Sequence, residues 1–155
     1  MPSPPGKVVA VCVSKTKGEK KAPVPFVRLV PGHGVDRDAH AGPGHRQVSL
    51  LAVESIAKMK EKGLSVGPGD FAENITVEGI DIVRLRVGDR LRSGEALLEI
   101  TQIGKECHNR CAIYYQAGDC VMPKEGVFAR VLHGGTLRAG DAMEIVDPRV
   151  SEGPG

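Results

Sequence analysis

The sequence predicts a single mainly β domain, a barrel of short strands with a few peripheral helices. Short apolar runs recur along the chain, whereas few stretches show the spacing of an amphipathic helix. The 155 residues include 20 glycines and 11 prolines, as expected for many tight turns. A chain of this length is most simply one domain that buries a real core.

The clearest strand is predicted over residues 8–13, an uninterrupted apolar run that contains Cys12. Cys12 is expected to be a small core residue without chemistry. Residues 90–92 and 96–100 flank a Ser-Gly-Glu turn, which is typical of a hairpin. Further strands are expected at residues 26–30, 47–51, 75–77, 80–83 and 143–146.

Two helices are predicted. The first covers residues 52–61, where Ile56 and Met59 share one face and Gly63 provides a stop. The second is expected to begin near Pro123, because proline suits a first helical turn. Its apolar positions and its terminating glycines would be Val127, Phe128, Val131, Leu132, Gly134 and Gly135.

An L-R-x-G-D pattern occurs twice, at residues 85–89 and 137–141, each time ahead of a predicted strand. We interpret the two copies as similar turns rather than as a duplication.

Composition excludes several function classes. Lys and Arg exceed Asp and Glu by only 2, and aromatic residues make up 3% with no tryptophan, which argues against a nucleic-acid binder. The N-terminal residues lack the apolar core of a signal peptide, and no apolar run is long enough to cross a bilayer. We therefore expect a cytoplasmic protein with no membrane partner and with reduced thiols.

The segment Lys105-Glu106-Cys107-His108-Asn109-Arg110-Cys111 places two thiols among cationic groups, and Cys120 follows. Nearby cations favour the thiolate, which can accept sulfane sulfur or bind a soft metal. Cys107, His108, Cys111 and Cys120 also offer the donor atoms of a zinc site, but their spacing matches no standard signature, so zinc is disfavoured. Incidental thiols at a strand end are the third interpretation.

Two further segments are rich in polar groups. Residues 36–47 form a glycine-rich stretch with His40, His45 and Arg46, suited to an anionic or heterocyclic ligand. The alternative is a surface loop whose acidic and basic residues, Asp38 included, pair locally. In residues 69–76, Glu73 and Asn74 either face a pocket or, together with Asp70, bond local backbone. Residues 15–21 are expected to be a solvated charged loop.

Taken in order, these segments resemble the MOSC domain, the module at the C-terminus of molybdenum cofactor sulfurases. The resemblance covers roughly residues 8–146, and the chain resembles the short, stand-alone bacterial type. We therefore expect a MOSC domain over 7–147 with flexible termini at 1–6 and 148–155. The segments that carry the resemblance are residues 38–42, 45–51, 69–76, 87–91, 110–111, 125–132 and 140–141.

The resemblance implies a β-barrel that handles the molybdenum cofactor (molybdopterin) or sulfur destined for metal centres, in a family also associated with pyridoxal phosphate enzymes. Cys111 best matches the family cysteine proposed to carry sulfur or to bind molybdenum. Cys107 would resolve or relay the sulfur, and Cys120 is a secondary thiol. The remaining candidates for holding the cofactor, its phosphate included, are His40, His45, Arg46, Asn74, Lys105, His108 and Arg110.

The function implied is cofactor binding or sulfur carriage by Cys111, as a persulfide or as a molybdenum-binding thiolate. Proteins of molybdenum cofactor biosynthesis or sulfur donors would be its partners. One alternative is a molybdenum-dependent oxidoreductase that reduces N-hydroxylated compounds with an external electron donor. An alternative of another class is a structural zinc-binding domain.

Overall fold

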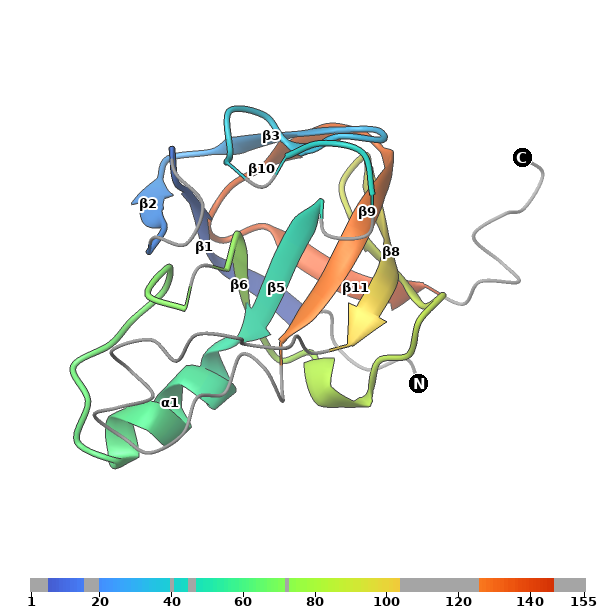
Figure 1. The fold of residues 1–155 in the computed structure, drawn as a ribbon. Coiled ribbons are helices and arrows are strands. Elements are labelled where there is room, and N and C mark those ends of the chain that lie inside the picture. Colours follow the sequence, from blue (N-terminus) through green and yellow to red (C-terminus); the bar gives the residue numbers. More distant parts are fainter. Residues whose placement is uncertain are drawn as a thin grey trace.

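The computed structural model describes residues 6–15, 20–39, 41–44, 47–71, 73–103 and 126–146, and in these ranges the fold is mostly β (Figure 1). The predicted fold class is confirmed, with one α-helix, α1 (Val53–Glu61), and one 3-10 helix, η1 (Ile82–Arg84), in the described part. The strands are β1 (Gly6–Val13), β2 (Ala22–Val24), β3 (Val27–Val30), β4 (Gly34–Val35), β5 (Val48–Ala52), β6 (Ile75–Glu78), β7 (Arg90–Ser93), β8 (Ala96–Ile103), β9 (Val127–His133), β10 (Gly135–Leu137) and β11 (Ala142–Val146).

Seven strands form a closed barrel in the order β11-β7-β8-β9-β5-β6-β1. Gly6 and Lys7 of β1 pair with Met143 and Ala142 of β11, which joins the two edges of the sheet. Only β5 and β6 are parallel; the other barrel neighbours are antiparallel. The small sheet β10-β3-β4 lies at one end of the barrel and α1 lies at the opposite end (Figure 1).

Side chains alternate between the barrel interior and a covered outer face. On β5, Val48, Leu50 and Ala52 belong to the interior core. Leu51 points outward and packs with Ile56 and Met59 of α1, together with Phe71 and Phe128. All five residues of β5 are therefore buried, and a strand covered on both faces reads as a continuous apolar run.

The two L-R-x-G-D segments form the same turn, as expected. In each, the aspartate carboxylate accepts the backbone N–H three residues earlier, at 2.8 Å for Asp89 and 2.9 Å for Asp141. The glycines have φ angles of 100° at Gly88 and 98° at Gly140, a region that other residues enter only with strain.

The likeness extends beyond the turns into the strands. The N–H of Gly88 donates to the carbonyl of Ile100 at 2.8 Å, and that of Gly140 donates to the carbonyl of Val8 at 2.7 Å. The pairing register shifts directly after each accepting residue, in β8 after Ile100 and in β1 after Val8. The triplets β7-β8-β9 and β11-β1-β6 are therefore equivalent in register.

An approximate two-fold axis relates these triplets. The axis runs through β5 at Leu50. Leu50 pairs with Ile75 of β6 and with Val127 of β9, and these two residues hold equivalent positions in the two triplets. On the other side of the barrel it passes the pair Arg92–Glu144, where β7 meets β11. Residues 14–74 connect β1 to β6, and residues 104–126 connect β8 to β9, so the two connections occupy equivalent places.

The second predicted helix is wrong, because residues 127–133 form β9. Val127 and Val131 point into the barrel while Phe128 packs on the outer face, so both faces are apolar and the alternation of a strand is hidden. Gly134 serves close packing instead of ending a helix, since an added Cβ would lie 2.7 Å from the carbonyl oxygen of Leu29.

Other predicted elements are largely confirmed. The strands near 8–13, 26–30, 47–51, 75–77 and 143–146 and helix α1 are present within one or two residues of the expected ends. The hairpin of β7 and β8 is also present, but β8 ends three residues later than expected, at Ile103. Residues 80–83 are not a strand, because η1 turns the chain at Ile82–Arg84. Strands β2, β4 and β10, each of two or three residues, were not predicted. The expected flexible termini lie almost entirely outside the described residues, and Gly6 already belongs to β1.

The equivalence of the two turns is testable with Gly88→Ala and Gly140→Ala. Each variant should lose a similar free energy of unfolding, about 1–2 kcal/mol, because each forces alanine into the left-handed region where no atom lies within 4 Å of its Cβ. Urea unfolding measures the losses. Gly67→Ala is the control, with open space and an ordinary φ, and should lose little. A twofold or greater disparity between the two turn variants would contradict the equivalence.

Candidate functional site

Of the predicted site residues, only Asn74 lies in the described part of the structure. The others lie outside it: His40, His45, Arg46, Lys105, Cys107, His108, Arg110, Cys111 and Cys120. The described residues that flank them nevertheless define where each segment leaves the barrel.

The loop that carries His40, His45 and Arg46 is anchored at both ends on the outer face of the barrel. Near its start, the N–H of Ala39 donates to the carbonyl of Ser14, just beyond β1, at 2.8 Å. Near its end, Gln47 accepts the N–H of Val131 in β9 at 3.0 Å and donates to the carbonyl of Gly44 at 3.3 Å. The loop therefore runs from the β1 side of the barrel to the β9 side.

Asn74 is fully buried on this outer face and ties three strands together. Its Nδ2 donates to the carbonyl of Cys12 in β1 at 3.1 Å. Its Oδ1 accepts the N–H of Ser49 in β5 at 3.0 Å, and its own N–H donates to the Ser49 hydroxyl at 3.0 Å. The side chain is thus held by strands distant in sequence, and not only by local backbone.

Glu73 and Asp70 follow the local turn chemistry that the sequence left as one alternative. The Asp70 carboxylate accepts the N–H of Gly67 at 2.8 Å. Buried Glu73 accepts the N–H of Gly69 at 3.0 Å and the hydroxyl of Thr76 at 2.6 Å. Burial raises the pKa of Glu73, an effect that these hydrogen bonds oppose without reversing it.

A buried ion pair anchors the start of the loop. Lys21 Nζ lies 2.8 Å from Asp38 Oδ1 and 3.0 Å from Oδ2, and neither side chain is accessible to solvent. Lys21 also donates to the Ser14 hydroxyl at 3.0 Å. Burial acts to raise the pKa of Asp38, but hydrogen bonds from Lys21, the Ser14 N–H and Asn74 outweigh it and lower the pKa.

This pair corrects one expectation and argues against one alternative. Lys21 was expected in a solvated charged loop, and local pairing of Asp38 was one of two interpretations of residues 36–47. They pair with each other across 17 positions instead, because β2 returns the chain alongside β1 and brings Lys21 to the outer face. Sequence alone carries no signal for this pairing, because Lys21 follows several other lysines and such a run is typical of the protein surface.

Cys12 lies next to this cluster and is fully buried. Burial is the main cause that raises the pKa of its thiol to about 12, and the nearby carboxylates of Glu73 and Asp70 add to the shift. Lys21 opposes it weakly. The burial of Cys12 confirms the prediction that it is a core residue, and a thiol with this pKa stays protonated at neutral pH.

A cavity of about 580 Å³ opens on the same outer face, over β8 and β9. Its wall includes Gly44 and Gln47, the described residues on either side of His45 and Arg46, and Thr101, two residues before the end of β8. The cavity thus borders the loop with the histidines, and its lining residue Thr101 lies four positions before Lys105 in the sequence. The complete lining is Gly32, Pro43, Gly44, Gln47, Val87, Gly88, Glu99, Ile100, Thr101 and Arg130.

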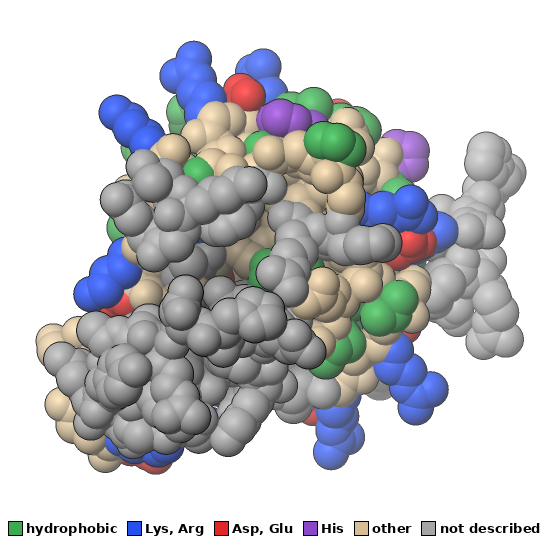
Figure 2. Space-filling model, in the orientation of Figure 1, with side chains coloured by type: hydrophobic (Ala, Val, Ile, Leu, Met, Phe, Trp, Pro, Cys, Tyr) green, Lys and Arg blue, Asp and Glu red, His purple; other side chains and the backbone are tan. Residues whose placement is uncertain are grey.

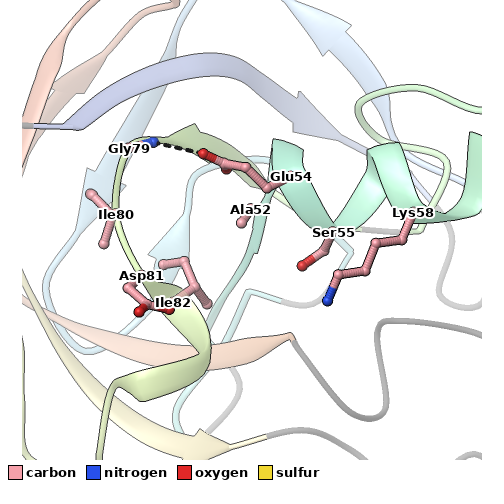
Figure 3. A pocket seen from close by; sticks show the side chains of 8 residues that line it. All are labelled: Ala52, Glu54, Ser55, Lys58, Gly79, Ile80, Asp81 and Ile82. Atoms are coloured by element: carbon pink, nitrogen blue, oxygen red, sulfur yellow. Dashed lines mark hydrogen bonds between the residues drawn. The ribbon is translucent and has the colours of Figure 1, made fainter.

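A second cavity, of about 400 Å³, lies between the start of α1 and residues 79–82 (Figure 3). Its two carboxylates already have protein partners: Glu54 accepts the N–H of Gly79 at 3.1 Å, and Asp81 pairs with Arg84 at 3.1 Å. Its floor is apolar, with Ile80 and Ile82 buried. Because both carboxylates bond protein groups, we interpret this cavity as a gap where the helix packs against the barrel and not as a ligand site.

The comparison with protein families identifies the fold's relatives. Residues 36–144 match the family model of the MOSC domain. The chain belongs to the MOSC domain family. This family is associated with binding of the molybdenum cofactor. A search of curated proteins found no sequence that matches.

Solved structures share the MOSC fold. The YuaD protein from Bacillus subtilis has a TM-score of 0.76 at 17% identity, over 90% of this chain and 94% of that one. YiiM from Geobacillus stearothermophilus has a TM-score of 0.69 at 21% identity, over 92% and 76% of the two chains. YiiM from Escherichia coli has a TM-score of 0.64 at 22% identity, over 94% and 71%.

The described part of the MOSC domain offers a cavity of about 580 Å³ on its outer face. Within the described residues, no group of three or more His, Cys, Asp or Glu side chains is arranged to hold a metal ion. The cavity over β8 and β9 has the volume of a small-molecule site and a wall with both polar and charged groups. No helix in the described ranges is long and apolar enough to span a membrane.

The buried pair is tested by Asp38→Asn at pH 7. This variant should lose about 3–5 kcal/mol of unfolding free energy, because Lys21 would remain charged and buried without its partner. Urea unfolding measures the loss. The double variant Lys21→Met/Asp38→Leu is the control and should recover most of it, because no lone charge remains.

The same variant has a defined pH dependence. The folded-state pKa of Asp38 is lowered, so its contribution to stability is present above its ordinary value of 3.8 and is lost as pH falls through the lowered pKa. The difference between wild type and Asp38→Asn should therefore shrink below about pH 4. A difference that stays constant from pH 7 to pH 3 would contradict the lowered pKa.

The thiol of Cys12 should resist alkylation in the native protein at pH 8. With a pKa of about 12 and no solvent exposure, almost none of it is accessible thiolate. Iodoacetamide labelling followed by peptide mass spectrometry measures this, and urea-unfolded protein is the control in which Cys12 should label fully. Rapid native labelling of Cys12 would show that the outer face opens.

Proposed function

We propose that this MOSC domain binds the molybdenum cofactor on the outer face of β8, β9 and β5, and that Cys111 serves as its working thiol. The observation that carries the proposal is the cavity of about 580 Å³, whose wall flanks His45 and Arg46 and approaches the start of the cysteine segment. In this proposal Arg46, Lys105 and Arg110 hold the phosphate, and His40, His45 and Asn74 support the heterocycle. His108 contributes to the cationic surroundings of the thiol.

Chain length permits the cysteine segment to reach this face. Ile103 and Val127 pair with each other, so the segment leaves and returns at one place on the barrel. Cys107 follows Ile103 by four residues and Cys111 by eight, so they can reach up to about 14 and 28 Å from it. The outer face has about the length of β5, which is five residues or roughly 17 Å. The reach of Cys111 exceeds this length.

In this proposal Asn74 acts indirectly: its side chain positions the strands beside the heterocycle and does not itself bind the ligand. Its amide already bonds Cys12 and Ser49, so it fixes where β5 and β6 begin beside the loop with His40. When bound, the cofactor supplies a redox-active molybdenum centre. The chain's own contribution is to orient the pterin, to compensate the phosphate charge and to present a thiolate.

As a sulfur carrier, Cys111 would act by thiol–persulfide exchange. Its thiolate attacks the outer sulfur of a donor persulfide, a new S–S bond forms, and the donor departs as a thiolate, so no external oxidant is needed. Cys107 would then accept or release the sulfur in the same way. Cationic neighbours favour both thiolates, because the reactive form carries negative charge.

Cys111→Ser tests the proposal in protein purified from cells that make the cofactor. The variant should lose bound molybdenum or the added sulfur mass, since serine neither binds molybdenum as a thiolate nor forms a persulfide. Elemental analysis and intact mass spectrometry measure the two. Cys12→Ala is the matched control, because that thiol is buried and protonated, and it should keep both loads.

The outcomes separate the alternatives. Molybdenum lost in Cys111→Ser supports metal binding, whereas a lost sulfur adduct without metal supports the carrier role. Unchanged loads in Cys111→Ser together with loss in Cys107→Ser or Cys120→Ser would move the role to that residue. Stoichiometric zinc that needs Cys107, His108, Cys111 and Cys120 would refute the proposal. Reduction of an N-hydroxylated compound with an artificial electron donor would favour the oxidoreductase alternative.

A further inference from the structure

Three charged side chains stand in a row on the outer face, beside the cavity over β8 and β9. Glu99 of β8 pairs in register with Arg90 of β7 on one side and with Arg130 of β9 on the other. Neighbouring residues in register point to the same face, so the three side chains meet. Of the three, Glu99 and Arg130 line the cavity.

The central carboxylate is shared between the two arginines. Its Oε2 accepts Arg90 Nε at 3.2 Å, and its Oε1 accepts Arg130 Nη2 at 2.6 Å and Nε at 3.0 Å. One carboxylate thus faces two guanidinium groups, which leaves a net charge of about +1 on this cluster.

Arg130 is the member of the cluster that is positioned for a ligand. Its side chain is 49% exposed, compared with 15% for Arg90 and 16% for Glu99. The bonds to Glu99 involve Nε and Nη2 only, and a guanidinium carries five N–H donors in a planar fork. The remaining donors of a half-exposed arginine, held in place by a partly buried partner, suit an oxyanion.

The view of Figure 2 shows Lys and Arg side chains spread around the periphery of the visible described surface. Arg130, by contrast, lines a cavity of about 580 Å³. A cavity of this size suits a small anion.

We infer that Arg130 binds the phosphate group of the ligand in this cavity, with Glu99 holding the guanidinium in place. The identity of the ligand, the phosphorylated pterin, rests on the proposed function. The anion site itself is inferred from the described residues alone. It adds a cofactor contact to the basic residues predicted from sequence, all of which lie in the two segments outside the described ranges.

Titration with inorganic phosphate, followed by NMR chemical shifts of the cofactor-free protein, tests the site. Wild type should show saturable shifts for residues around the cavity. Arg130→Ala should weaken the apparent affinity about tenfold or more, because a hydrogen-bonded charge is lost. Arg90→Ala is the matched control, since it removes the other guanidinium on Glu99 without altering the cavity wall, and it should change affinity by less than about threefold.

Three results would overturn the anion site: no saturable binding by wild type, equal binding by Arg130→Ala, or equal losses in both arginine variants, which would indicate general charge alone. Protein loaded with cofactor distinguishes the source of the phosphate. If the cofactor's own phosphate fills the site, loaded protein should no longer bind inorganic phosphate, and undiminished binding would refute that assignment. A protein that binds phosphate through Arg130 but never acquires molybdenum would refute the proposed function and leave the anion site intact.

Discussion

The rest of the structure depends on the pairing of β1 with strands on both of its edges. One edge of β1 bonds β11 through Gly6 and Lys7, which closes the barrel, and then bonds β2 through Val11 to Val13. The other edge bonds β6. Lys21 of the buried Lys21–Asp38 pair directly precedes β2, which pairs with β1. The same strand that closes the barrel therefore also positions the anchor of the loop on its outer face.

The approximate two-fold symmetry places two unrelated segments at equivalent positions of the barrel. Residues 104–126 join β8 to β9, and residues 14–74 join β1 to β6, at equivalent positions about β5. Each junction follows a strand that contains a bulge, and bulges are frequent beside functional sites because they redirect the strand. The segment with the cysteines and the segment with His40 and Asn74 therefore start from matching corners of the barrel.

Local pattern predicted the elements whose signals are short-range. The run at 8–13, the hairpin around Ser93 and helix α1 each carry their own periodicity or turn. It failed at β9, where Phe128 packs outward under α1 and makes the strand apolar on both faces. It also missed Lys21, Asp38 and the row of Arg90, Glu99 and Arg130, because each depends on strands that meet only in the folded barrel. Asn74 was singled out from its apolar neighbours in sequence, but its bonds to Cys12 and Ser49 depend on the folded barrel.

Cys12 shows what this fold does to a thiol without cationic support. Burial beside Glu73 and Asp70 raises its pKa to about 12, although Lys21 is near, because Asp38 already neutralises that lysine. A working thiol on the same domain therefore needs cations that are not committed to a carboxylate. On the described face, Arg130 is itself paired with a carboxylate, that of Glu99, which it shares with Arg90. The concentration of Lys105, His108 and Arg110 around Cys111 is what the electrostatics of the barrel require if that cysteine is to react as a thiolate.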